Sequence, residues 1–379
     1  MSELAFTNAR IVLRDEVITG SVLVRDGVIA AIDTGSVSHG EDVGGEYLIP
    51  GLVELHTDHF ESHYRPRQGV TWNALAALQA HDAQVAGAGI TTVFDAVRIG
   101  SDPETGDITE DVRLMVEAVA EADADDRLRA DHHIHLRCEL ATPDVAEHFL
   151  AHCTNPIVGL ASLMDHTPGA RQYVTLEHYI AYYQKKLRLS DTEMAQFIAE
   201  RQKARRLHAD GNREAILERG REIGLAFASH DDATVEHVDE AVRDGMSIAE
   251  FPTTMEAAQA CHAAGLAVLM GAPNVVRGKS HNGNISAAEL ARAGVLDVLS
   301  SDYVPFALLY AAFLLPELAD SIALPDSVAM VSARPAAAAQ LADRGQIAVG
   351  KRADLVRVRR REGDVPVVRS VWRQGQRVS

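Results

Sequence analysis

Histidine and acidic residues recur in this sequence directly after short apolar runs. Five runs end this way: His56 and Asp58 follow LVEL, Glu139 follows HLRC, His166 follows ASLMD, His230 follows LAFAS, and Asp302 closes VLSSD. Alternate residues of an extended strand point to the same side, so the side chains of His56 and Asp58 in the H-x-D pair can bind one ion. Imidazole and carboxylate ligands without cysteine are typical of an open hydrolytic metal site. The pattern predicts one or two divalent ions; zinc is our expectation, with manganese, iron and magnesium left open.

These residues need elements that bring strand ends together. Between residues 51 and 340, apolar runs alternate with amphipathic stretches, which indicates βα units and a parallel sheet. Eight βα units in about 290 residues favour a TIM-like (β/α)8 barrel, an α/β fold whose sites lie at the carboxyl ends of the strands. The predicted strands cover residues 52–56, 90–96, 132–140, 157–164, 224–229, 247–251, 267–270 and 295–299.

The two ends of the chain share a different pattern. Residues 6–33 and 355–379 alternate apolar and polar residues between Asp-Gly, Glu-Gly and Gln-Gly turns, as antiparallel strands do. We therefore predict one small β-sandwich domain from residues 1–50 and 341–379, with the barrel at 51–340. A charged, helical insertion interrupts the barrel at about 170–222; it could cover the barrel mouth or form a contact in a homodimer.

The composition limits which binding partners and which cellular compartment are expected for this protein. Among 379 residues, 54 are acidic and 36 are basic, and the net charge of -18 repels nucleic acid. Three cysteines without CxxC spacing indicate reduced thiols, and no signal peptide precedes the domain, so we expect a cytoplasmic protein. The longest apolar run, residues 304–315, is too short to cross a bilayer, so no membrane partner is expected.

Several segments carry a family resemblance. The strings IPGLVELHTD, SSD and GKRADLV resemble the amidohydrolase superfamily. Longer strings resemble one diphosphatase family within it, which acts on alpha-D-ribose 1-methylphosphonate 5-triphosphate in the carbon-phosphorus lyase pathway; they are LHTDHFESHYRPR, HDAQVAGAGITTVFDAV, SLMDHTPGARQY, AEFPTTMEAA and LMGAPNVVRGKSHNGN. The resemblance implies hydrolysis of the triphosphate to the 5-phosphate and pyrophosphate during phosphonate catabolism.

The resemblance also implies roles for residues. Asp302 occupies the position that takes a proton from water, so it is expected to be both general base and metal ligand. The other expected ligands are His56, Asp58, Glu139, His166 and His230. Two features depart from the common superfamily pattern: H-x-D replaces H-x-H, and Glu139 stands in for a bridging lysine. Glu250 and Phe251 lie where some relatives have a further histidine.

A substrate with several negative charges needs local cations on an acidic protein. Salt limits the reach of an exposed charge to about 8 Å, so a basic cluster near the site can outweigh distant acids. Guanidinium groups bind phosphate through two parallel donors, and ammonium groups bind it as point charges. The candidate substrate-binding residues lie in loops after the predicted strands: Arg65, Arg67, Arg171, Arg277, Lys279 and His281.

Other roles stay open from the sequence alone. A C–N hydrolase or deaminase of the same superfamily is the main alternative, because fold does not determine reaction. A barrel that has lost its metal would be a non-catalytic scaffold. We expect the histidines of the H-H-x-H run at 132–135 to be structural packing residues and not a second metal site. We expect Asp82 to lie on the polar side of a helix. Asp231 could orient an imidazole, bind ribose or cap a helix.

Overall fold

The structure is a computed structural model that describes residues 3–35, 39–102, 105–171, 176–278, 284–361 and 363–379. The chain forms two compact units. The first unit comprises Met1–Asp95, Ala118–His133 and Met270–Ser379, and the second comprises Ala96–Glu117 and Ile134–Leu269. These two units differ from the two predicted domains, whose boundaries lie at residues 50 and 341, so the domain boundaries stay a prediction.

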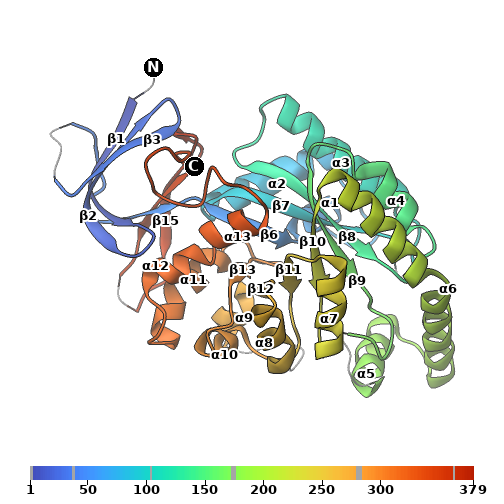
Figure 1. The fold of residues 1–379 in the computed structure, drawn as a ribbon. Helices are drawn as coiled ribbons and strands as arrows, with labels where there is room; N and C mark the ends of the chain where they lie inside the picture. The colour runs from blue at the N-terminus through green and yellow to red at the C-terminus, as the bar shows by residue number, and fades with distance from the viewer. Residues whose placement is uncertain (1–2, 36–38, 103–104, 172–175, 279–283, 362) are drawn as a thin grey trace. The chain divides into compact units, whose positions relative to one another are not determined.

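The chain termini form one mainly antiparallel sheet within the first unit. Its strand order is β16-β15-β14-β5-β1-β2-β3, with β4 beside β1, so the blue N-terminal and red C-terminal strands share one sheet (Figure 1). Phe6 and Trp372 pack edge to face in its core, with ring centroids 4.7 Å apart. The strands are β1 (Glu3–Val12), β2 (Val17–Arg25), β3 (Val28–Asp33), β4 (Glu41–Asp42), β5 (Tyr47–Pro50), β14 (Leu355–Arg359), β15 (Val367–Arg373) and β16 (Gln376–Arg377).

The hairpin of β2 and β3 shows why this sequence forms such a sheet. Arg25 pairs with Val28, which leaves Asp26 and Gly27 as a two-residue loop. Both loop residues have positive φ angles, 48° and 79°, as the mirror-image turns that match strand twist require. An Asp-Gly pair tolerates these angles, so the predicted antiparallel pattern of residues 6–33 is confirmed.

All eight predicted barrel strands are present. They form an eight-stranded sheet in the order β13-β12-β11-β10-β9-β8-β7-β6, and a parallel bridge between Thr57 and Asp302 joins its first and last strands. The chain therefore forms a nearly closed parallel barrel, as expected. The strands are β6 (Leu52–Thr57), β7 (Ile90–Ile99), β8 (Asp131–Glu139), β9 (Val158–Met164), β10 (Ala226–His230), β11 (Ile248–Glu250), β12 (Ala267–Gly271) and β13 (Val298–Ser300).

Helices follow most barrel strands. They are α1 (His59–Tyr64), α2 (Ala74–Gly87), α3 (Thr109–Ala124), α4 (Val145–His152), α5 (Leu176–Leu187), α6 (Asp191–Ile223), α7 (Val235–Asp244), α8 (Met255–Ala263), α9 (Ala272–Arg277), α10 (Ala287–Arg292), α11 (Ala307–Leu318), α12 (Leu324–Ala329) and α13 (Ala333–Ala338). Among the described residues, no helix is both long enough and apolar enough to cross a bilayer.

The predicted insertion consists of α5 and the 33-residue helix α6. Ser190 caps α6 through a reciprocal pair of hydrogen bonds with Glu193, which satisfies two backbone donors at the start of the helix. Gly224 ends it at a φ of 71°, a conformation that glycine adopts without a steric penalty. Local sequence signals therefore define both ends of this long helix.

Candidate active site

Three of the predicted ligands meet in the first unit. His56 Nε2 lies 3.7 Å from Asp58 Oδ1, and His56, Asp58 and Asp302 each place a ligand atom within 4.8 Å of the others. Backbone hydrogen bonds hold the arrangement: Asp58 N donates to Asp302 O at 3.0 Å, and Asp302 N donates to His56 O at 3.1 Å. Pairing between β6 and β13 thus brings together residues far apart in the sequence.

A buried carboxyl group, that of Glu54, binds the backbone at these residues. Glu54 accepts hydrogen bonds from the backbone N–H of His56 at 2.7 Å and of Ser301 at 2.5 Å. Burial raises the pKa of Glu54 to about 7, against the lowering effect of these donors. Glu54 therefore positions the backbone next to His56 and Asp302, a role that the sequence analysis missed.

Glu139 and His166 form a close pair in the second unit. Glu139 Oε2 lies 2.6 Å from His166 Nδ1, and Glu139 Oε1 accepts from the His166 backbone N–H at 3.1 Å. Burial alone would raise the pKa of Glu139, but His166 and Arg98 lower it to about 2. The carboxylate orients the imidazole, which leaves His166 Nε2 as the ring nitrogen that could bind a metal, and the ligand role expected for Glu139 stays a prediction.

His166, His230 and Asp231 make up a second group that could hold a metal ion. Asp231 Oδ2 lies 3.7 Å from His166 Nε2 and 3.6 Å from His230 Nε2. This oxygen is buried and has no hydrogen-bond partner among the described residues. A buried, unsatisfied carboxylate oxygen that faces two imidazole nitrogens is a donor set that fits a divalent cation. Asp231 thus joins the candidate ligands, and its place beside His230 was the available sequence signal.

Glu250 contacts both His230 and His135 in the same unit. Glu250 Oε2 lies 3.1 Å from His230 Nδ1, and Glu250 Oε1 lies 3.8 Å from His135 Nδ1. All three side chains are buried. Glu250 therefore orients His230 by its Nδ1 side, so that Nε2 faces Asp231, as carboxylates commonly orient metal-binding histidines.

Three residues at strand ends have left-handed backbone angles. Asp231, Phe251 and Asp302 each have a φ of 55°, and they follow β10, β11 and β13. Aspartate tolerates this region better than most residues, whereas for phenylalanine it is strained. The bends turn the chain at the carboxyl edge where the ligand side chains lie. Backbone strain of this kind is commonly found at functional sites.

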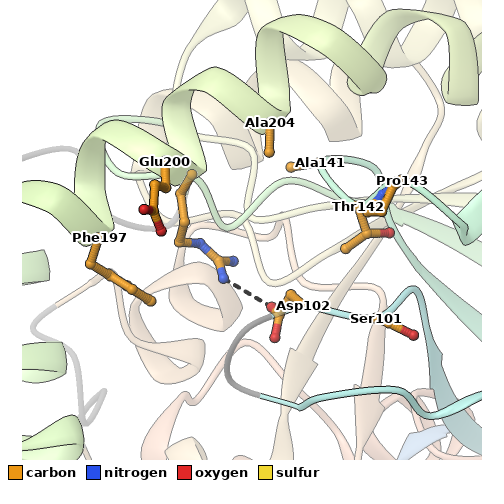
Figure 2. Close-up of a pocket in the computed structure, with 9 residues that line it drawn as sticks. Ser101, Asp102, Ala141, Thr142, Pro143, Phe197, Glu200 and Ala204 are labelled. Carbon is orange, nitrogen blue, oxygen red and sulfur yellow. Dashed lines mark hydrogen bonds and ion pairs between the residues drawn. The ribbon is translucent and has the colours of Figure 1, made fainter.

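A buried ion-pair chain connects helix α6 to Glu139. Arg201 Nη1 donates to Asp102 Oδ2 at 2.9 Å, Arg98 Nη2 donates to the same oxygen at 2.6 Å, and Arg98 Nη2 lies 3.7 Å from Glu139 Oε2. Arg201 of α6 and Asp102 both line a cavity of about 200 Å³. Figure 2 shows Asp102 in this lining, together with Phe197 and Glu200 of the same helix. Burial opposes ionisation of Asp102, but the arginines and Thr105 lower its pKa below the usual range.

We expect Arg201→Met to destabilise the protein, because it removes one of the two arginines that pair with the buried carboxylate of Asp102. The free energy of unfolding should fall by about 3 kcal/mol, the lower end of the cost of breaking a buried pair. Urea unfolding followed by circular dichroism measures the change. Lys203→Met, an exposed site on the same helix, is the matched control and should change stability little. Equal stability of both variants would contradict this role for Arg201.

Two further histidines belong to a fully buried polar cluster in the first unit. His81 Nε2 and His132 Nδ1 each lie 2.7 Å from an oxygen of Asp95. Asp82 accepts from the side chain and backbone of Arg129 at 2.9 and 2.8 Å, and it lies 3.4 Å from His132 Nε2. The expectation for Asp82 was wrong: its side chain is completely buried, because these partners offset its desolvation.

This cluster should make stability depend on pH. Burial alone would lower the pKa of His132, but Asp95 and Asp82 raise it to about 9. The charged histidine therefore stabilises the fold fully below its unfolded pKa of about 6.5, and this contribution is lost as the pH rises through 9. We expect the stability difference between the wild type and His132→Gln to shrink from pH 6.5 to pH 9 in urea unfolding. Identical pH profiles for the two proteins would refute the expectation.

The predicted substrate-binding residues fall in different surroundings. Arg65, Arg67 and Arg277 are exposed in the first unit. Arg171 is buried in the second unit, where its guanidinium group binds Asp232 and Glu240. Lys279 and His281 lie outside the described residues. Arg171 therefore already has carboxylate partners, while the three exposed arginines are accessible to an anion.

Comparison with known proteins assigns the family. Residues 189–379 match the amidohydrolase family. The chain is also 44% identical over 378 residues to the alpha-D-ribose 1-methylphosphonate 5-triphosphate diphosphatase of Escherichia coli (strain K12), across 99% of this chain and 100% of that protein. The resemblance read from the sequence motifs is thus confirmed.

Solved structures support the same fold. The 5-methylcytosine deaminase from Klebsiella pneumoniae aligns with a TM-score of 0.66 at 14% identity, covering 99% of this chain and 98% of its own. N-acetyl-D-glucosamine-6-phosphate deacetylase from Mycobacterium smegmatis aligns with a TM-score of 0.66 at 16% identity, covering 99% and 100%. With its nearly closed barrel and its full-length relative, this chain belongs to the amidohydrolase family.

Proposed function

We propose that the protein is a metal-dependent hydrolase that cleaves alpha-D-ribose 1-methylphosphonate 5-triphosphate to the 5-phosphate and pyrophosphate in phosphonate catabolism. The full-length relative, 44% identical, carries the choice of substrate. The two ligand groups, one in each unit, support the metal-dependent chemistry.

We propose two groups of the described residues as the metal ligands. His56, Asp58 and Asp302 form one, and His166, His230 and Asp231 form the other, with Glu139 orienting His166. We propose zinc as the ion, since imidazole and carboxylate ligands suit it, although the same donors accept manganese and iron. Divalent ions at such sites lower the pKa of bound water and polarise phosphoryl oxygens.

Asp302 serves as the general base in this proposal. Its backbone bonds to His56 of β6 and to Asp58, which follows that strand, and its side chain lies in the same group as these two residues. Hydrolysis forms a bond between a water oxygen and phosphorus and breaks the bridging P–O bond between the α- and β-phosphates. Asp302 takes the proton that the water loses, and pyrophosphate leaves.

Phosphorus NMR of the triphosphate incubated with metal-loaded protein tests the reaction directly. We expect signals of pyrophosphate and a 5-phosphate to appear while the phosphonate signal stays unchanged. Reaction in ¹⁸O-labelled water adds a second result, because the isotope-shifted product identifies the phosphorus that water attacks: the 5-phosphate for α attack, or pyrophosphate for β attack.

Unchanged triphosphate signals, with metal shown to be bound, would overturn the proposed substrate. A C–N hydrolase or deaminase would then be the next hypothesis, to be tested with cyclic amides and aminated bases. These enzymes are the next candidates because they share the fold and its metal-dependent chemistry, and the fold alone does not determine the reaction.

We further propose that the enzyme works in the cytoplasm, as a homodimer. Cys138, Cys153 and Cys261 are all buried and free, which suits a reducing compartment. Helix α6 presents many charged residues along 33 positions and is the surface we assign to the dimer contact. Size-exclusion chromatography with light scattering tests the oligomeric state.

A further inference from the structure

A cavity of about 480 Å³ lies within the second unit, beside the loop that follows β9. That loop, helix α6 and helix α7 all contribute to its lining. Asp165 and Thr167, the residues on either side of His166 in the sequence, both line the cavity. Its position at the carboxyl end of a barrel strand is where substrates of this fold bind.

Both carboxylates in the lining are already satisfied. Asp165 Oδ2 accepts from Arg205 Nε at 2.5 Å, and Asp165 Oδ1 accepts from the Thr167 backbone N–H at 3.1 Å. Glu240 Oε1 binds Arg171 and lies 2.8 Å from Arg213 Nη2. These ion pairs neutralise the two acids, so they do not repel an anion as free carboxylates would.

Donors in the lining remain unused. The side chain of Thr167 is buried, with the residue 2% exposed, and its Oγ1 has no hydrogen-bond partner among the described residues. Arg206 is exposed and forms no ion pair or hydrogen bond with the described part of the chain. An orphaned buried hydroxyl carries an energetic cost that a ligand oxygen would relieve.

His237 adds a third donor. Its Nδ1 accepts from the Ala233 backbone N–H at 3.2 Å, so in the neutral ring the proton lies on Nε2. Burial and the nearby charge of Arg171 lower the pKa of His237, which favours this neutral form. A hydroxyl, a guanidinium group and an imidazole N–H around one cavity match the acceptor oxygens of a phosphoryl group.

We propose that this cavity binds a terminal phosphoryl group of a polyphosphate, through Thr167, Arg206 and His237. The inference rests on the proposed function for the choice of polyphosphate, since the triphosphate end of the substrate and the released pyrophosphate share this chemistry. None of these three residues is among the cations that the sequence motifs nominated. The 33-residue insertion helix thereby supplies part of the substrate site.

Isothermal titration of the full-length, metal-loaded protein with inorganic pyrophosphate tests the site. We expect Arg206→Ala to weaken binding about tenfold, or about 1.4 kcal/mol, and the isosteric Thr167→Val to weaken it about threefold. Lys203→Ala, on the same helix but outside the lining, is the matched control and should bind as the wild type does. Wild-type affinity in both Arg206→Ala and Thr167→Val would overturn the proposal.

Kinetics with the triphosphate separate the two sources of the phosphoryl group. A KM that rises in Arg206→Ala by the same factor as the pyrophosphate Kd assigns the cavity to the bound substrate. A higher Kd for pyrophosphate with an unchanged KM for the triphosphate supports the site and assigns it to free pyrophosphate. If the wild type hydrolyses no triphosphate but Arg206→Ala still weakens pyrophosphate binding, the proposed substrate fails and the anion site stands.

Discussion

Asp302→Asn should abolish most turnover while the fold remains intact. We expect kcat to fall by about 10²- to 10⁴-fold, the usual contribution of a positioned general base, because an amide cannot take the proton from water. Asparagine keeps the size of the side chain and tolerates the φ of 55° at this position, so the backbone bonds to β6 should survive. Steady-state hydrolysis assays and circular dichroism measure the two effects.

Asp320→Asn controls for the loss of one acidic charge. This residue is exposed and lies outside both ligand groups, so the same chemical change should leave activity unaltered. Near-normal turnover in Asp302→Asn would show that another group accepts the proton. A misfolded variant is recognised by its circular dichroism spectrum and thermal transition, which distinguishes it from a folded but inactive enzyme.

His230→Ala should lose metal as well as activity. His230 Nε2 lies 3.6 Å from Asp231 Oδ2, and Glu250 orients the ring through Nδ1. Loss of a ligand should weaken metal binding by about 100-fold or more, since even residues that only orient a ligand contribute roughly 10- to 100-fold. Elemental analysis after dialysis against a buffered metal solution reports the bound ion, and kcat should fall with it.

Two further variants make that result specific. Asp231→Asn removes the buried carboxylate charge but keeps the shape and tolerates the φ of 55°, so it should also lower metal content. His262→Ala, an exposed histidine on α8, should keep the wild-type content. Full metal content in both His230→Ala and Asp231→Asn would remove these residues from the ligand set.

The strand pattern was the most predictable part of the fold. Apolar runs such as LVELH and ITTVFDA are short and bounded, so they predicted β6 and β7 within a few residues. The terminal sheet was equally readable, because alternation and the Asp26-Gly27 turn are local signals. Such features need only neighbouring residues to be recognised.

The partners of the site residues were less predictable. The sequence placed Glu139 and His166 after strands, but only the neighbouring positions of β8 and β9 explain why Glu139 binds both the ring and the backbone of His166. Asp82 was expected on a polar helix face, yet it is buried against His132 and Arg129. Burial of a charge depends on contacts that are distant in sequence.

By itself, the sequence determined the βα rhythm, the identity of the candidate ligands and, through long shared motifs, the family. Only the tertiary structure decided which of these residues touch: His56 with Asp302 across β6 and β13, and Asp231 with two histidines. It also revealed two unused donors in the lining of one cavity, the buried hydroxyl of Thr167 and the exposed guanidinium group of Arg206. The physical reason is that strand propensity is local, whereas the desolvation and pairing of polar atoms depend on the whole packed fold.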